Sequence, residues 1–98
     1  MSDTSSDQSG SFAILHLPPI LDLRAAAPLV VEFGGLRGRP LTIDASAVEK
    51  IGAQCVQVLV SAQQTWARDG VTLTLSKPSE AFNGALALLG VPTRKIGE

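Results

Sequence analysis

The chain has 98 residues, of which 45% are hydrophobic and 4% aromatic, and its formal net charge is −1. A chain of this length supports one small domain with one modest core, built mainly from Leu, Val, Ile and Ala. The basic residues are scattered along the sequence, so it lacks the basic face that nucleic-acid binding requires. We expect the few large core side chains to be Phe12, Phe33, Trp66 and Phe82.

The sequence predicts a cytoplasmic protein that does not insert into a membrane. No apolar run approaches the roughly 18 to 20 residues that span a bilayer, and a single cysteine forms no internal disulfide. Residues 1–11 are rich in Ser, Asp and Gly and lack the basic and apolar regions of a secretory signal. We expect a disordered tail over residues 1–11 and a single domain over residues 12–98.

The first third of the domain predicts two extended segments and a helix. The apolar run over residues 12–17 is typical of a strand, and the prolines at 18–19 interrupt it because they donate no ladder hydrogen bond. Residues 20–23 resume extended structure. Pro28 suits the first turn of a helix, and an apolar stripe over residues 29–36 follows it.

The middle of the chain predicts a strand, a loop and a long helix. Residues 41–43 are apolar and partly β-branched, whereas residues 44–50 are too polar and irregular to continue the strand. From about Gly52 a helix presents two stripes at helical spacing. The inward stripe is Cys55, Leu59, Ala62 and Trp66, and the outward stripe is Gln54, Gln57, Ser61, Gln64 and Arg68.

The last third predicts a strand, a helix and a polar tail. Residues 71–75 alternate apolar and polar side chains, after a turn at Asp69 and Gly70. Ser79 suits the N-cap of a helix that ends before Gly90. Its expected inward residues are Phe82, Leu86 and Leu89. Because strands alternate with helices, we expect βαβ crossovers and a parallel or mixed sheet covered by helices.

The outward stripe of the long helix predicts a protein-binding surface. Glutamine amides and a serine hydroxyl hydrogen-bond without the desolvation penalty of an ion, so a partner covers such a face at little cost. The alternative is an ordinary solvated face. The predicted partner-binding residues are Gly52, Ala53, Gln54, Gln57, Ser61 and Gln64.

The sequence predicts no catalytic residues, metal site or cofactor. His16 and Cys55 are the only residues of their kind, and we expect one at a strand end and the other as a small core filler. No phosphate-binding glycine loop, metal-ligand cluster or paired-carboxylate motif is present. Asp22, Asp44 and Glu49 are candidates for turns or caps.

The order of elements over residues 12–91 resembles the STAS domain of anti-sigma-factor antagonists and sulfate transporter tails. The segments that carry the resemblance are Ile20–Leu29, Leu41–Val48, Thr72–Pro78 and the Leu-Leu-Gly-Val that starts at Leu88. The resemblance implies a small α/β fold with a mixed or parallel four-stranded sheet packed by three or four helices. It also implies a non-catalytic regulator that binds other proteins.

One position departs from the phosphorylated members of that family. They carry Asp-Ser-Ser-Gly at the start of the second helix, and this chain has Gly52, Ala53, Gln54 and Cys55 there. Gln54 therefore stands at the position of the phospho-accepting serine and offers no hydroxyl. We expect no phosphorylation switch, and we interpret the nearby Ser46 as a backbone-capping side chain.

The segment from Ala47 to Ala62, with Trp66 following, resembles the short STAS proteins encoded in chemotaxis operons of alphaproteobacteria. This narrower resemblance implies docking on the chemotaxis histidine kinase or its response regulator. Two alternatives stay open. One is an anti-sigma-factor antagonist without its switch, with an anti-sigma serine kinase as partner. The other is the STAS subunit of a lipid-transporting ABC complex, with an ABC ATPase as partner.

Overall fold

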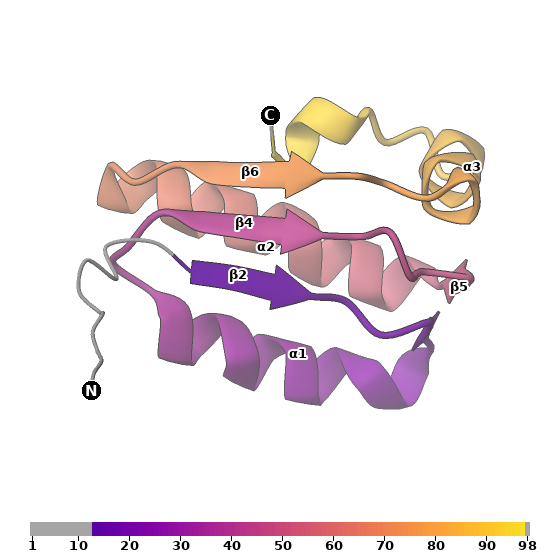
Figure 1. The fold of residues 1–98 in the computed structure, drawn as a ribbon, viewed down its shortest axis with the longest axis horizontal. Helices are drawn as coiled ribbons and strands as arrows, with labels where there is room; N and C mark the ends of the chain where they lie inside the picture. Colours follow the sequence, from indigo (N-terminus) through magenta and orange to yellow (C-terminus); the bar gives the residue numbers. More distant parts are fainter. Residues whose placement is uncertain (1–12, 98) are drawn as a thin grey trace, which may run out of the picture.

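The fold was analysed in a computed structural model that describes residues 13–97. The predicted tail over residues 1–11, and Phe12, which was expected in the core, lie outside this range. Three parallel strands form the main sheet of the described chain (Figure 1). They are β2 (Ala13–His16), β4 (Leu41–Asp44) and β6 (Leu73–Ser76), in the order β2-β4-β6.

The three strands lie side by side and pair over their full lengths. Leu15 pairs with Ile43, which pairs with Leu75, and the carboxyl ends of the strands meet as His16, Asp44 and Ser76. Side chains alternate between the two faces, so Leu41, Ile43 and Leu73 are buried. The α/β class with parallel strands is confirmed.

A second, two-stranded parallel ribbon consists of β3 (Ile20–Leu21) and β5 (Lys50–Ile51). The expected four-stranded sheet is therefore corrected to three strands plus this separate pair over the described residues. Pro18 and Pro19 end β2 and redirect the chain. The Pro19 carbonyl then accepts hydrogen bonds from the amides of Glu49 and Lys50 and so starts the ribbon.

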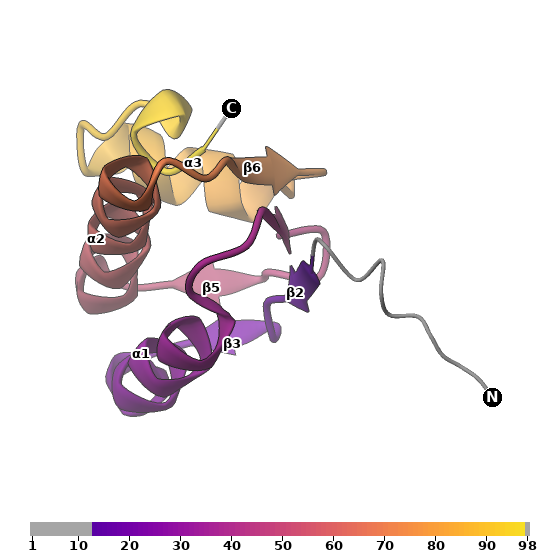
Figure 2. The same cartoon turned by 90° about the vertical axis from the view of Figure 1, so that its left-hand side faces the viewer.

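Three helices and one short 3-10 turn complete the described fold: α1 (Leu23–Leu36), α2 (Ala53–Asp69), α3 (Glu80–Leu88) and η1 (Thr93–Lys95). Figure 2 shows α1 and α2 on the same face of the main sheet. Figure 1 shows α3 beyond the carboxyl ends of the strands, and α3 contacts β5. Helix α1 lies in the crossover from β2 to β4, and α2 lies in the crossover from β4 to β6, as in βαβ units.

Helix α1 begins earlier than the sequence predicted. We placed Pro28 in the first turn, whereas it lies inside the helix, which starts after Asp22. The Asp22 carboxylate accepts a hydrogen bond from the Arg24 amide at 3.1 Å and caps the helix. This cap and the alanine run before Pro28 outweigh the single backbone hydrogen bond that the proline removes.

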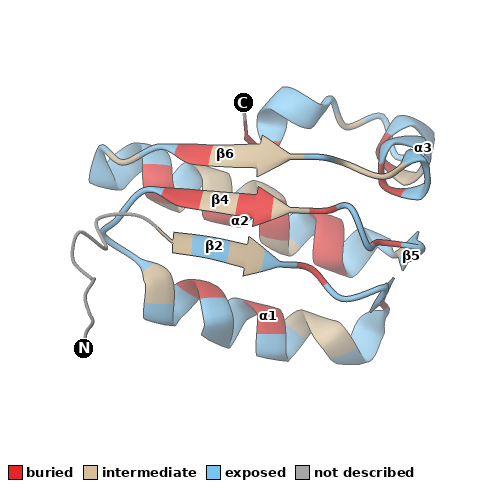
Figure 3. Ribbon diagram, viewed as in Figure 1, coloured by how far each residue is buried: buried red, intermediate tan, exposed pale blue. Residues whose placement is uncertain are grey.

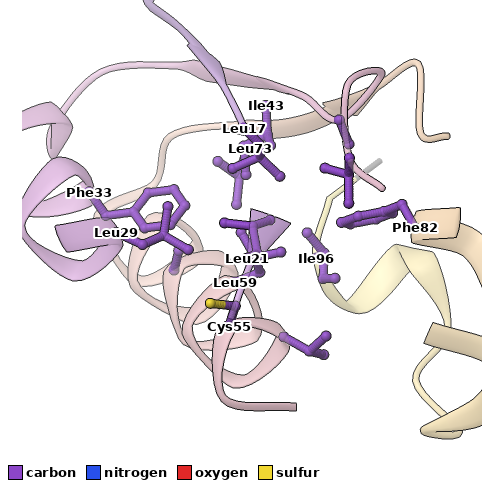
Figure 4. Close-up of a cluster of buried hydrophobic side chains, with 14 of the residues drawn as sticks. Leu17, Leu21, Leu29, Phe33, Ile43, Cys55, Leu59, Leu73, Phe82 and Ile96 are labelled. Carbon is purple, nitrogen blue, oxygen red and sulfur yellow. The ribbon is translucent and has the colours of Figure 1, made fainter. Parts of the chain in front are cut away.

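The core confirms the inward stripe of α2. Cys55, Leu59, Ala62 and Trp66 are all buried, and so are Phe33 and Phe82. Figure 3 shows the buried residues gathered where the sheet meets α2, and Figure 4 shows the side chains of α1, α2 and the strands converging on one cluster.

The C-terminal region differs from the prediction in two ways. Leu89, expected to face inward, is 45% exposed because α3 ends at Leu88 and Leu89 is its C-cap. The tail was expected to be polar throughout, yet Ile96 is fully buried and joins the same cluster as Phe82. The Gly97 backbone lies so close to β6 that an added Cβ would be 2.9 Å from the Leu73 oxygen.

Candidate functional site

The uncharged face of α2 is the candidate site. Gln54, Gln57, Ser61 and Gln64 recur along one side of the helix, and all four are exposed. Arg68 continues the stripe at the end of α2. The opposite side of the helix is packed into the core, so these side chains face away from it. The structure thus brings the predicted residues onto one surface.

The first turn of α2 lies at one end of this face. Gly52 is the N-cap, in extended conformation, and no side chain of the described residues caps the helix. The first turn also contains no acidic residue. The leading amides of a helix have no partner within it and carry a partial positive charge. Gly52, Ala53 and Gln54 therefore present an open helix end to the solvent.

Cys55 lies just behind this helix end and faces the core. Its thiol donates a hydrogen bond to the Asp22 carbonyl at 3.3 Å, and it is fully buried. Burial, reinforced by the Asp22 carboxylate, raises the pKa of the thiol. A thiol with a raised pKa is a poor nucleophile, so Cys55 is the core filler that the sequence predicted.

The carboxyl ends of β2 and β4 bring together His16, Asp44 and Ser46. One Asp44 oxygen accepts hydrogen bonds from both the Ser46 hydroxyl, at 2.7 Å, and the Ser46 amide, at 2.9 Å. The other Asp44 oxygen lies 3.4 Å from His16 Nδ1. The carboxylate is shared between the two residues, and the serine hydroxyl donates to this carboxylate, which is not the contact with a base that activates a nucleophile.

This geometry corrects the prediction for Ser46. We interpreted its side chain as a cap for the backbone, but the hydroxyl donates to Asp44 and the Asp44 carboxylate does the capping. Asp44 is the last residue of β4, and its carboxylate caps the backbone that follows, as expected of a cap candidate. The hydrogen bonds from the Ser46 hydroxyl and amide lower the pKa of Asp44.

Replacing Asp44 with asparagine is expected to weaken the acid sensitivity of the fold. A carboxyl with a lowered folded-state pKa stabilises the fold above its unfolded pKa of about 3.9, and this stabilisation is lost as the pH falls through the folded value. Melting temperatures between about pH 2 and pH 6 should therefore decline less steeply for Asp44→Asn than for wild type. Ser46→Ala removes the hydroxyl donor, and its melting temperature should decline with a steepness between those of Asp44→Asn and wild type. If the melting temperature of Asp44→Asn falls with pH as steeply as that of wild type, the Asp44 carboxylate does not contribute to the acid sensitivity of the fold.

A shallow groove borders the candidate face between α1 and α2. It has a volume of about 260 Å³, and its apolar floor includes Phe33 and Trp66. Ser61 forms part of its rim, next to Val30 of α1, which is 55% exposed. Sequence reasoning missed this groove, because the helical spacing of Val30 and Gly34 predicts a shared face but not which helix lies beside it.

An ion pair closes the far end of the groove. The Arg37 guanidinium donates two hydrogen bonds to the Asp69 carboxylate, at 3.0 and 3.1 Å. These hydrogen bonds hold the pKa of Asp69 below its ordinary value. The pair joins the ends of α1 and α2, and α2 itself has no charged residue from Gln54 to Gln64.

The fold and this surface define a small α/β module with one exposed, uncharged helix face. A family model described as "Mlab, STAS domain" matches residues 5–96. The chain therefore belongs to the STAS domain family. A search of curated proteins returned no match.

A solved structure shares this fold. The crystal structure of a sulfate transporter family protein from Wolinella succinogenes superimposes with a TM-score of 0.69 and 22% sequence identity. The match covers 90% of this chain and 73% of the other. At this identity the likeness concerns the fold alone.

Membership of the STAS family indicates a general class of function. STAS domains are generally non-enzymatic modules that regulate other proteins or interact with them. Within residues 13–97, no helix is both long and apolar enough to cross a membrane. No group of three or more His, Cys, Asp or Glu side chains in that range is arranged to hold a metal ion.

Proposed function

We propose that this STAS domain is a non-catalytic regulator that docks on a chemotaxis histidine kinase, or on the response regulator that the kinase serves. The observation that carries this proposal is the exposed, uncharged face of Gln54, Gln57, Ser61 and Gln64 on α2. The resemblance of the Gly-Ala-Gln-Cys segment to chemotaxis STAS proteins supports the choice of partner. The regulator acts by occupying a surface of its partner, without transferring a phosphoryl group itself.

Gln54 removes the phosphorylation switch that a serine at this position provides in the phosphorylated members of the family. Gln54 lies in the first turn of α2, and its amide accepts no phosphoryl group. A phosphate at this position would place a charge of about −1.5 to −2 at the open helix end. A glutamine keeps the surface neutral at all times. The proposed regulator is therefore controlled by its abundance or by the state of its partner.

Changing Gln54 to glutamate is expected to weaken partner binding by about 1 to 3 kcal/mol if the side chain is buried in the complex. The same change should leave the isolated domain as stable as before or slightly more so, because an acidic side chain in the first turn of a helix is favourable. Isothermal titration against the purified histidine kinase measures the first effect, and a thermal melt measures the second. In the same titration, Gln57→Glu should weaken partner binding as Gln54→Glu does.

Asn83→Asp is the matched control for this experiment. It makes the same amide-to-carboxylate change at an exposed position on α3, away from the predicted face. We expect wild-type affinity for this variant. Unchanged affinity for both glutamine variants, with melts that show folded protein, would move the interface elsewhere. Absence of binding by the wild-type protein would reject the kinase, and the response regulator would be titrated next.

A second candidate function is the STAS subunit of a lipid-transporting ABC complex. The description of the matching family model, "Mlab, STAS domain", favours it. In that case the α2 face binds an ABC ATPase, and the glutamine variants weaken that complex instead. The anti-sigma-factor antagonist is distinguished by the same titration with an anti-sigma serine kinase.

A further inference from the structure

Two stripes of side chains border the groove between α1 and α2. The stripe on α1 is Leu23, Ala27, Val30 and Gly34, and the stripe on α2 is Gln54, Val58, Ser61 and Thr65. Both have the spacing i, i+4, i+7 and i+11, which keeps side chains in line along one side of a helix. The C-terminal half of each stripe lines the groove itself. Neither stripe contains a charged residue, so the groove has an apolar wall on α1 and a largely polar, neutral wall on α2.

The two helices run in the same direction and lie side by side (Figure 2). At their amino ends, the Cys55 thiol of α2 donates to the carbonyl of Asp22, the N-cap of α1. At their carboxyl ends, Arg37 forms its ion pair with Asp69. Each partner of this pair continues its stripe by about one further helical turn. The stripes therefore stay next to each other over the length of both helices.

The groove suits the side chains of another protein better than a small molecule. Its volume of about 260 Å³ is below the roughly 300 to 1,000 Å³ of small-molecule sites. Its apolar wall is open to solvent, since Leu23 is 69% exposed and Val30 is 55% exposed. Ala27 and Gly34 are small, and a Cβ added at Gly34 would meet no atom within 4 Å. The backbone of a partner can therefore come close to α1.

We propose that an amphipathic helix of the partner docks along this groove, with its apolar side on the α1 stripe and its polar side on the α2 stripe. Such a helix inserts the side chains of one face, at i, i+3, i+4 and i+7, between the two walls. This inference rests on the proposed function, because Gln54 and Ser61 belong both to the α2 stripe and to the predicted partner-binding face.

The carboxyl ends of α1 and α2 carry an excess of positive charge. Arg37 is paired with Asp69, whereas Arg68 and Arg39 form no ion pair within residues 13–97. Arg68 lies in the last turn of α2, and the Arg39 carbonyl accepts a hydrogen bond from Trp66 of the groove floor. The partial negative charge of the two helix ends offsets part of this excess. An acidic side chain of the partner is favoured at this end.

The other charged residues near the groove do not reverse this preference. At the amino ends of the helices, Asp22 and Arg24 have opposite charges, and so do Glu49 and Lys50. Glu32 lies on the opposite side of α1, where it lines a separate pocket. The excess of positive charge is thus confined to the carboxyl ends of α1 and α2. This asymmetry sets the direction of the partner helix, whose acidic end lies there.

Isothermal titration of the full chain against the purified histidine kinase tests this proposal. We expect the dissociation constant of Val30→Asp to rise at least about tenfold, because a carboxylate in the apolar wall loses its water and meets an acidic partner. Val31→Asp is the matched control. It makes the same change at the next residue of α1, which is 73% exposed and points about 100° away, so wild-type affinity is expected. Thermal melts verify that both variants are folded.

Arg68→Gln tests the charge part of the proposal. Its dissociation constant should rise about two- to fivefold, and its affinity should depend less on sodium chloride than that of wild type. Arg24→Gln, at the amino end of α1, is the control and should keep the wild-type salt dependence. Hydrogen exchange of the kinase in the complex should protect a helix that contains acidic residues. Protection of an extended or basic segment would overturn the proposal.

The Gln54 and Val30 variants together distinguish failure of the groove proposal from failure of the proposed function. If Gln54→Glu weakens binding while Val30→Asp binds as Val31→Asp does, the partner contacts α2 alone and the groove proposal is wrong. If neither the kinase nor the response regulator binds the wild-type chain, the proposed function fails and the groove proposal fails with it. Binding to phosphatidylglycerol vesicles that Val30→Asp abolishes would assign the apolar stripe to a membrane instead.

Discussion

Replacing Trp66 with alanine is expected to lower the free energy of unfolding by about 3 to 5 kcal/mol. Trp66 is 1% exposed, and its ring meets the Phe33 ring edge-on, with centroids 5.9 Å apart and an interplanar angle of 73°. Its indole nitrogen donates to the Arg39 carbonyl at 2.8 Å. The side chain therefore joins α2 to α1 and to the segment that leads into β4, and alanine loses both contacts.

Urea unfolding followed by circular dichroism measures this effect. Trp66→Phe is the control, because it keeps an aromatic ring in the core and removes the hydrogen bond together with only part of the buried apolar surface. Its loss of stability should be clearly smaller than that of the alanine variant. A small domain has a total stability at the low end of about 5 to 15 kcal/mol, so Trp66→Ala should be close to unfolding. A loss below about 1 kcal/mol would show that the site collapses around the cavity.

Replacing Ile96 with alanine is expected to cost about 2 to 5 kcal/mol, although it lies near the end of the printed sequence. Its side chain is fully buried in the same cluster as Leu73 and Phe82 (Figure 4). The η1 turn holds it there, since the amides of Ile96 and Gly97 both donate to the Thr93 carbonyl. Loss of this anchor should release the segment from β6 before the rest of the domain unfolds.

Hydrogen exchange of the amides in β6 and η1, together with chemical unfolding, tests this prediction. Lys95→Ala is the matched control, because Lys95 is exposed and precedes Ile96, and its effect should stay within about 0.5 kcal/mol. Similar exchange rates and stabilities for Ile96→Ala and Lys95→Ala would mean that the C-terminal segment contributes nothing to the fold.

Much of α2 was predictable because its signal is local and repeated. Cys55 and Trp66 share one helical stripe, and Gln54 and Gln64 share another, over a helix of 17 residues. Four turns of consistent spacing leave little doubt about which side faces the core. The caps by Asp22 and Ser79 were also foreseeable, since both side chains suit an N-cap.

Other features depend on contacts that the sequence does not display. Ile96 is a single apolar residue in a polar segment, so it forms no period and gives no signal of burial. The exposure of Leu89, which we expected to face inward, depends on where α3 ends, and sequence patterns locate helix ends poorly. Pro28 was placed at the start of a helix by a local preference that the Asp22 cap and the packing of Leu29 overrode.

By itself, the sequence determined the class of fold, from the alternation of predicted strands and helices, and the inward and outward stripes of α2, from side-chain spacing along one helix. It also showed that Gln54 has no hydroxyl. The tertiary structure alone decided which strands pair, that Ser46 donates to Asp44, and that a groove lies between α1 and α2. These features join residues that are distant in sequence or depend on where elements end. Their geometry is set by packing of the whole chain, which periodicity within one segment does not encode.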